Sequence, residues 1–576
     1  MGRLAGHVAI LIVAAVGPWS MEQAAAQQSV VAEKFVVVTG HPDATTAALA
    51  VLENGGNVMD AAVTASMCVG VAEPYGSGLG GKVMLLYRDG ATGKVSAVEA
   101  MCAAPAALDS EKFAKLRSRE RYFGYTAVAV PGLVSGLHAA HAKWGSRPWK
   151  ELVVPAAELA ERGVNIDEKS RRFYRAKVTQ LRKDPETARL YLVKGAAPEV
   201  GDVMRNADLG RSLRLVADGG PRAFYEGEIA NKIVAAATAA GAPLALEDFR
   251  QFEPRWNQPL AIHYNGYKVY SCPPPLTGGT TVLMSLRALE HLDPLGARAA
   301  RSGHYIDQIG RVLLAVYPPV TAKIADTPRS FVDAQKLLGA ETARRIAQSA
   351  RRIAQSARTV DPLDPYGDAV PAGVGEATAD DHPDASTTHL TIADADGNIV
   401  CLTQSLSYHF GACTIVPGTG FLLNNSMSNF STRNPEGVNY AQPTKRERST
   451  IAPIIATRDG KPALALGIPG GQRIPTTTLQ LLVDVLGDDV PLAEAFDRPR
   501  FHVRRPRGSD ESPNIVDLEE DAPAELDAEL KDLGWKTVRK RRDGSYFGGG
   551  NAVLYRSDGK LEGVADLRRT NSAAGK

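Results

Sequence analysis

The amino-acid sequence predicts an α/β protein in which helices and sheets pack in layers. Helical patterns dominate from Leu133 to about Arg358, and strand patterns alternate with two helical stretches in the final third. Helices followed by mixed strands in one chain favour a layered sandwich. No stretch in the middle resembles a linker between independent units. We therefore expect the 576 residues to form one large unit or two closely packed halves.

The composition is that of a soluble protein with a sizeable core. The chain is 44% hydrophobic and 23% charged, with a formal net charge of +2, which is ordinary for globular proteins. No basic stripe is interleaved with aromatic residues, so nucleic acid is not an expected partner. The basic run at 539–542 is interpreted as a solvated helix end or a strand edge.

The N-terminus predicts export. Arg3 precedes a short apolar stretch at 8–16, and three alanines at 24–26 offer a cleavage site, so residues 1–26 have the form of a secretory signal peptide. The apolar stretch is shorter than the ~20 residues that span a membrane, and no later segment is long and apolar enough to do so. The mature protein is expected to be periplasmic or secreted, without a membrane span.

The first elements alternate between strand and helix. The β-branched run at 35–38 predicts a strand. An alanine-rich helix over 44–54 should end at Gly55 and Gly56, and a second helix is predicted over 61–71. A turn-rich loop at 73–81 follows, and 83–87 and 95–98 are expected to pair as strands.

The middle of the chain contains a short internal repeat. The heptad RRIAQSA occurs at 344–350 and again at 351–357, which predicts a lengthened surface helix and is too short for a solenoid. Residues 359–386 are rich in Pro, Gly and Asp and predict an exposed connecting segment. Strands are then expected at 388–393 and 399–406, and helices at 476–486 and 522–533.

Five cysteines are few and odd in number for an exported chain, and no CxxC pair suggests zinc. Cys401 and Cys413 could pair across neighbouring strands, but buried free thiols are the favoured interpretation. We expect neither a metal nor a cofactor.

Thr387 is the candidate nucleophile. The connecting segment delivers it to the start of a strand. If the chain is cut before it, one residue carries both a hydroxyl and an α-amine whose pKa is ~7.7–8.0. Such an amine can accept the proton of the hydroxyl and activate it. Taken alone, however, this threonine-rich start is better explained by β propensity.

Several motifs distributed over the mature chain favour the interpretation of Thr387 as a nucleophile. They are GGNVMDAA (55–62), EPYGSGLGG (73–81), AVPG (129–132), FYEG (224–227), PPP (273–275), STTHLTIADADGN (386–398), LLNN (422–425), PGGQRI (469–474) and RPRFH (498–502). In these motifs the chain resembles the gamma-glutamyltransferase family of N-terminal nucleophile hydrolases.

The resemblance implies a precursor that cuts itself between Ser386 and Thr387. The large fragment, 27–386, and the small fragment, 387–576, would remain associated as one four-layer αββα sandwich. Thr387 would attack a small-molecule amide and form an acyl-enzyme. Gly470 and Gly471 match the glycines of the family's oxyanion hole, where backbone amides approach the developing charge. Ser405 matches a hydroxyl residue that supports the nucleophile.

The residues that recognise the acyl group depart from the family pattern. Met101 stands where the family has an arginine that binds the α-carboxylate of a glutamyl group. A thioether cannot replace the charged, bidentate guanidinium of that arginine. Ser407 replaces an asparagine, and Asn429 replaces the aspartate that binds the α-amine. Ser449 and Thr450 replace a pair of serines. We therefore expect a changed, non-glutamyl acyl specificity.

Two further features bear on the pocket. Lys82 interrupts the glycine run, and a solvated loop lysine is favoured over a relocated charge for an acidic substrate. The segment 431–448 is short beside family members that carry a lid, which predicts a more open site.

Other interpretations remain. The run Gly76 to Lys82 matches a phosphate-binding pattern, but Val83 stands where magnesium binding requires Ser or Thr. His138 and His141 could share a helix face, yet no third metal ligand is near. A true gamma-glutamyltransferase or glutathione hydrolase is the main functional alternative, and an uncleaved, non-catalytic binding protein is another.

Overall fold

The computed structural model describes residues 29–292, 301–355, 385–504, 514–542 and 546–576. Two seven-stranded sheets form its centre. The first has the order β1 (Ser29–Ala32), β18 (Leu561–Ala565), β17 (Asn551–Tyr555), β13 (Lys461–Gly467), β12 (Ile454–Arg458), β9 (Tyr267–Ser271) and β8 (Leu260–Tyr264). The second has the order β19 (Ser572–Gly575), β2 (Phe35–Thr39), β10 (Ala385–Asp394), β11 (Ile399–Tyr408), β3 (Lys82–Arg88), β4 (Val95–Ala100) and β7 (Arg255–Asn257). Neighbouring strands in both sheets are antiparallel.

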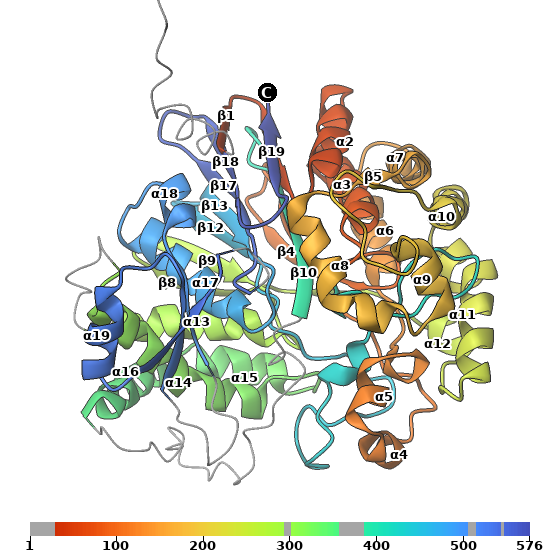
Figure 1. The fold of residues 1–576 in the computed structure, drawn as a ribbon. Helices are drawn as coiled ribbons and strands as arrows, with labels where there is room; N and C mark the ends of the chain where they lie inside the picture. Colours follow the sequence, from red (N-terminus) through yellow and green to blue (C-terminus); the bar gives the residue numbers. More distant parts are fainter. Residues whose placement is uncertain (1–28, 293–300, 356–384, 505–513, 543–545) are drawn as a thin grey trace, which may run out of the picture.

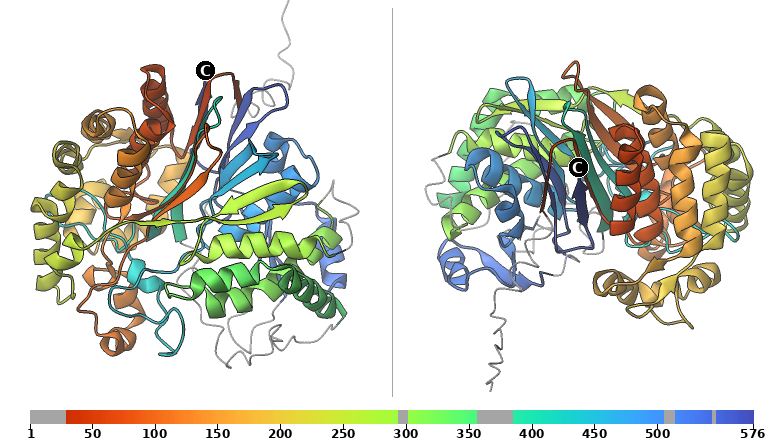
Figure 2. Two further views of the ribbon diagram at one scale, coloured as in Figure 1. Left: turned by 180° about the vertical axis from the view of Figure 1, so that it is seen from behind. Right: turned by 90° about the horizontal axis from the view of Figure 1, so that it is seen from above.

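Helices cover the outer faces of the two stacked sheets (Figures 1 and 2). The second sheet is covered by the layer that contains α2 (Pro42–Glu53), α3 (Val58–Ala72), α6 (Leu133–Trp144), α7 (Trp149–Arg162), α10 (Ala207–Tyr225) and α11 (Glu228–Ala239). The first sheet is covered by the layer that contains α13 (Thr277–Leu289), α14 (Gly303–Lys323), α16 (Ala340–Gln355) and α17 (Arg473–Leu482). The predicted αββα sandwich is confirmed.

Smaller elements surround this sandwich. The remaining helices are α4 (Ser110–Lys115), α5 (Ser118–Tyr122), α8 (Glu168–Leu181), α9 (Pro185–Tyr191), α12 (Leu246–Arg250), α15 (Ser330–Leu337), α18 (Leu492–Asp497) and α19 (Glu525–Asp532). One small sheet joins β14 (Phe501–Val503), β15 (Ile515–Glu519) and β16 (Lys536–Lys540), and another joins β5 (Val164–Asn165) and β6 (Val203–Met204). The basic run at 539–542 begins at the end of β16, an edge strand, as predicted.

The middle layers explain the strongly apolar strands. On β2, Val36 and Val38 belong to the core between the sheets, whereas Val37 packs against the layer of α2 and α3. Every residue of β11 is buried. A strand covered on both faces has no solvent side that would require alternating polar residues.

Both sheets combine strands from before and after Thr387. In the second sheet, β10 lies between β2 and β11, and β19 lies at the edge beside β2. In the first sheet, the four strands of 454–565 lie side by side between β1 at one edge and β9 and β8 at the other. The segments on either side of the predicted cut are therefore intertwined in one core.

Most predicted elements are present within a few residues of their expected bounds, with one clear error. The stretch predicted as mainly helical also contains β7, β8 and β9. As far as Gln355 the heptad repeat lies on α16, and its apolar face packs into the core through Ile346, Ala350 and Ile353. The predicted signal peptide and most of the connecting segment, 356–384, lie outside the described residues.

All five cysteines are buried free thiols, so the favoured interpretation is confirmed. Within the described ranges no helix is long and apolar enough to cross a membrane. The same residues contain no group of His, Cys, Asp and Glu side chains that could hold a metal. The rings of His138 and His141 pack against Trp149.

Candidate active site

Thr387 lies opposite a β-bulge in strand β11. Ser386 pairs with Ser407 and Thr388 pairs with Gln404, so one residue of β10 faces two residues of β11. The Thr387 side chain is buried, and its Oγ1 lies 3.4 Å from Oγ of Ser405. A bulge disrupts the ladder locally and redirects a side chain. The chain is continuous through Ser386–Thr387.

The strand opposite Thr387 is held in an unfavourable conformation. Ser407 has φ +83°, a left-handed value that costs a non-glycine residue ~1–3 kcal/mol. Its N–H donates to Oγ of Ser405 at 2.8 Å. Because Ser386 pairs with Ser407, the strained residue lies directly opposite the peptide bond that is predicted to be cleaved.

The carbonyl of Thr387 is also fixed. Arg569 donates from Nη1 to this oxygen at 2.8 Å. Next to it, Oγ1 of Thr388 donates to Oε2 of Glu73 at 2.7 Å, and the Tyr75 hydroxyl donates to Oε1 at 2.9 Å. Burial raises the pKa of Glu73, and the positive charge of Arg569 opposes that shift. These side chains form a buried hydrogen-bonded group next to the start of strand β10.

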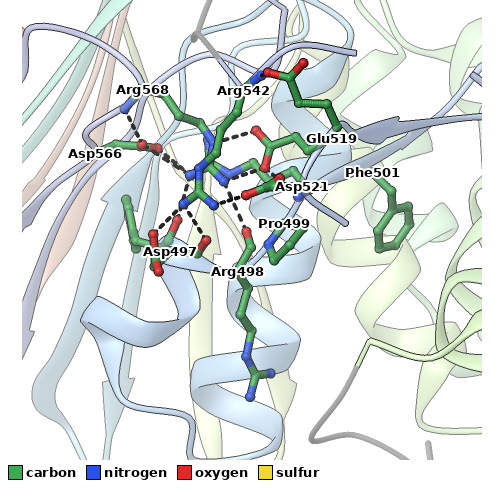
Figure 3. Close-up of polar contacts among 12 residues, drawn as sticks. Asp497, Arg498, Pro499, Phe501, Glu519, Asp521, Arg542, Asp566 and Arg568 are labelled. Atoms are coloured by element: carbon green, nitrogen blue, oxygen red, sulfur yellow. Dashed lines mark hydrogen bonds and ion pairs between the residues drawn. The ribbon is translucent and has the colours of Figure 1, made fainter. Parts of the chain in front are cut away.

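A network of ion pairs places the segment that carries Arg569. Arg568 donates from Nε to Oε1 of Glu519 at 2.6 Å and lies 3.3 Å from Asp566 (Figure 3). Asp566 also accepts hydrogen bonds from the backbone of Gly550 and from the guanidinium of Arg500. This buried network immobilises the chain one residue before Arg569.

Gly470 and Gly471 precede helix α17 with φ +138° and +60°. Oγ1 of Thr450 donates to the carbonyl oxygen of Gly471 at 2.8 Å. In the described part of the chain, neither glycine N–H donates to another backbone carbonyl. Amides at a helix N-terminus favour negative charge, so the pair has the chemistry of an oxyanion site.

His389 connects this glycine segment to the nucleophile strand. A Cβ on Gly467, three residues before Gly470, would clash with the His389 ring. The ring nitrogens contact Thr403 at 2.8 Å and Thr391 at 3.0 Å. Burial lowers the pKa of His389 to about 3, so the ring is neutral at ordinary pH and serves to pack the site.

Ser407 and Asn429 meet at a buried ion pair. Nζ of Lys82 lies 2.6 Å from Oε1 of Glu447 and donates to Oγ of Ser407 at 2.7 Å. Nδ2 of Asn429 donates to Glu447, and to Ser407 at 3.2 Å. Lys82 is 1% exposed. Its interpretation as a solvated loop lysine is therefore wrong, because it begins strand β3 and points into this cluster.

The other predicted recognition residues have different recorded partners. Met101 is fully buried and belongs to the core between the sheets. Its N–H donates to Glu99, and its carbonyl accepts from Arg446. Ser449 accepts from the N–H of Thr277 through its carbonyl.

The loop before β3 packs closely against the site. A Cβ on Gly81 would clash with the carbonyl of Ser405, and one on Gly80 would clash with that of Leu422. This contact leaves no room for a phosphate, so the nucleotide interpretation is not supported. Thr387 is 4% exposed and Asn429 2%, and the more open site stays a prediction for the cleaved protein.

Three members of the site were missed in the sequence. Glu447 stands in the charged run Arg446-Glu447-Arg448 directly before Ser449, which was a usable signal. Glu73 stands at the head of the EPYGSGLGG motif. Arg569 has no local signal, because its partner lies 182 residues away in the chain.

Comparisons with known proteins agree with this geometry. The family model described as Gamma-glutamyltranspeptidase matches residues 44–576. The Acylase ACY 1 proenzyme of Pseudomonas sp. (strain V22) is 31% identical over 543 residues, covering 92% of each chain. The Glutathione hydrolase proenzyme of Pseudomonas sp. (strain A14) is 32% identical over 497 residues, covering 83% of each.

A solved structure extends the agreement to the fold. The cephalosporin acylase of Bacillus halodurans superimposes with a TM-score of 0.83 at 26% identity, covering 96% of this chain and 97% of that one. Both the fold and the family model place the chain among enzymes with an N-terminal nucleophile. The chain belongs to the gamma-glutamyltranspeptidase family.

Proposed function

We propose that this chain is an exported precursor that cuts itself before Thr387 and then hydrolyses an amide with a non-glutamyl acyl group. The observation that carries the proposal is the buried placement of Thr387 opposite the bulge of β11, with Ser405 beside its hydroxyl and Arg569 on its carbonyl. Residues 1–26 would direct export and be removed.

Self-cleavage follows from this placement. Oγ1 of Thr387 would attack the carbonyl carbon of Ser386, the C–N bond would break, and the hydroxyl proton would end on the new α-amine. Water would then hydrolyse the resulting ester. The strained Ser407, opposite Ser386, favours distortion of the bond that breaks.

Catalysis would use the groups that cleavage releases. The α-amine of Thr387 would accept the proton of Oγ1 as the oxygen attacks the substrate carbonyl. Backbone N–H groups of Gly470 and Gly471 would stabilise the oxyanion. The leaving amine departs with a proton, and water or an acceptor amine resolves the acyl-enzyme. The large and small fragments would remain associated through the shared sheets.

The acyl specificity is argued from three positions. Met101 provides no cation for an α-carboxylate, and its side chain is buried in the core. Ser407 and Asn429 are uncharged and bonded to the Lys82–Glu447 pair. A bidentate arginine is the group best suited to an α-amino acid carboxylate, and this site offers none at Met101.

The test is the intact mass of the purified protein beside Thr387→Ala and Thr387→Ser. We expect two fragments that meet at Ser386–Thr387 in the wild type, slower production of the same fragments in Thr387→Ser, and one uncut chain in Thr387→Ala. An uncut wild-type chain would contradict the proposal and favour a binding protein. High activity on a gamma-glutamyl anilide, absent in Thr387→Ala, would instead identify a glutathione hydrolase.

A further inference from the structure

Lys82 and Glu447 form an ion pair that is almost completely withdrawn from solvent. The two side chains are 1% and 0% exposed. Removing two charges from water is costly, and replacing such a pair by apolar residues is often neutral or stabilising. Stability therefore does not explain why this pair stands where it does.

The pair adjoins the nucleophile. Lys82 is the direct partner of Ser405 in the β3–β11 ladder, and Ser405 contacts Oγ1 of Thr387. Directly opposed residues project their side chains from the same face. Ser407, which receives a hydrogen bond from Lys82, donates its N–H to Ser405. The charged pair thus lies one side chain beyond the group that contacts Thr387.

The hydrogen bonds of this cluster are incomplete. The ammonium of Lys82 has three N–H groups; Ser407 accepts one of them, and Oε1 of Glu447 lies 2.6 Å away as the ion-pair partner. Ser407 also contacts Oγ of Ser426 at 3.1 Å. In the described residues, Oδ1 of the buried Asn429 and Oε1 of Glu447 have no hydrogen-bond partner, although Oε1 forms the ion pair with Lys82. A donor on Lys82 and an acceptor on Asn429 are therefore available to a ligand.

The charges of the cluster cancel. A substrate carboxylate would lie beside Glu447, and a substrate ammonium would lie beside Lys82, so each would meet a like charge at close range. The nearby cation Arg446 is directed elsewhere, to the carbonyls of Met101 and Glu253 and toward Glu99. The cluster suits a neutral group that both donates and accepts hydrogen bonds.

We propose that the Lys82–Glu447 pair, with Asn429, forms the end of the acyl pocket and selects acyl chains that terminate in an uncharged carboxamide. The carboxamide N–H would donate to Oδ1 of Asn429, and its oxygen would accept from Nζ of Lys82. This inference rests on the proposed function, because it names the acyl group that Thr387 receives.

The first experiment compares four 4-nitroanilides with acyl chains of similar length. Their chain ends are a carboxamide (the glutaramic acid anilide), a carboxylate (glutaryl), an α-amino acid (gamma-glutamyl) and a methyl group (pentanoyl). We expect kcat/KM to be highest for the carboxamide, by about 10-fold over pentanoyl, since two hydrogen bonds are gained. A preference for the glutaryl or gamma-glutamyl anilide would overturn the assignment.

The second experiment removes the negative charge of the Lys82–Glu447 pair. Glu447→Gln keeps the shape of the side chain and leaves Lys82 as an unpaired cation. We expect the glutaryl anilide to gain at least about 10-fold in kcat/KM relative to the carboxamide. Asp307→Asn is the matched control, because Asp307 also forms a buried pair, with Arg311 on α14, away from Thr387. The control should leave the order of substrates unchanged.

A second variant covers the case in which Glu447→Gln fails to fold or to cut itself. Lys82→Met combined with Glu447→Leu removes both charges, and we expect it to lose the advantage of the carboxamide over pentanoyl. An unchanged order of substrates in either variant would overturn the proposal. A wild-type protein that cuts itself but hydrolyses none of the anilides would contradict the amidohydrolase function itself, whereas hydrolysis in another order would contradict only the pocket.

Discussion

Arg569 donates a hydrogen bond from Nη1 to the carbonyl oxygen of Thr387 at 2.8 Å. The bond holds the backbone of the residue whose amine and hydroxyl must both be placed for reaction. Arg569 is itself fixed through Arg568, which pairs with Glu519 and Asp566. The C-terminal segment thereby positions the first residue of the predicted small fragment.

Removing this bond should affect kcat more than KM. We expect Arg569→Met to lower kcat by about 10²-fold, because a small misplacement of a reacting group has effects of that size, and to slow self-cleavage. Arg569→Lys should recover part of the loss by restoring the charge near Glu73. Arg214→Met, which breaks an exposed pair with Glu161, is the control. A rise in KM with unchanged kcat would contradict a positioning role.

The contact between Thr450 and Gly471 gives a second prediction. Thr450→Val is similar in shape but cannot donate to the Gly471 carbonyl. We expect kcat to fall about 10-fold, as a hydrogen bond that orients the site is lost, with KM and melting temperature nearly unchanged. Gly470→Ala should be more severe, about 10²–10³-fold, because φ +138° excludes most side chains. Full activity in both variants would remove the glycine pair from the mechanism.

Much of the fold could be predicted because its signals are local. The β-branched run of β2 and the alanine-rich α2 were both predicted from the sequence. The error lies at β8 and β9, which are joined by Asn265-Gly266 with φ +46° and +80°. Asn-Gly between short apolar runs is a strong hairpin signal, but this one stands within a stretch where helical patterns dominate.

Only those residues of the site that lie in local sequence motifs could be predicted. Thr387, Ser405 and the glycine pair lie in recognisable motifs. The environment of Lys82 depends on Glu447, which is distant in sequence and near only because strand β3 and the segment after Asn429 meet at β11. A lysine after a glycine run is usually solvated, so the long-range partner decides its role and the local sequence does not.

The pH dependence of activity should report the α-amine of Thr387. We expect kcat/KM to rise with pH through a single ionisation near the ~7.7–8.0 of an α-amine. His389 should add no acidic limb, because burial lowers its pKa to about 3. A profile measured for His389→Gln should keep the same midpoint. A midpoint that moves in this variant would assign the base to His389.

The pH dependence of stability should, in contrast, depend on His389. Its pKa is 6.5 as a reference and about 3 when folded, so the unfolded chain binds a proton between these values that the folded chain does not. The contribution of His389 to the free energy of unfolding is therefore complete above pH 6.5, and it is lost as the pH falls toward 3. The loss amounts to about 1.4 kcal/mol per pH unit.

Denaturant unfolding of the wild type and of His389→Gln at several pH values checks this sign. The free energy of unfolding of the wild type should fall more steeply below pH 6.5 than that of the variant, so the two curves converge in acid. His263→Gln, at an exposed position of β8, should parallel the wild type. Parallel curves for wild type and His389→Gln would mean that the ring is protonated in the folded protein, and its contacts with Thr391 and Thr403 would then be those of a cation.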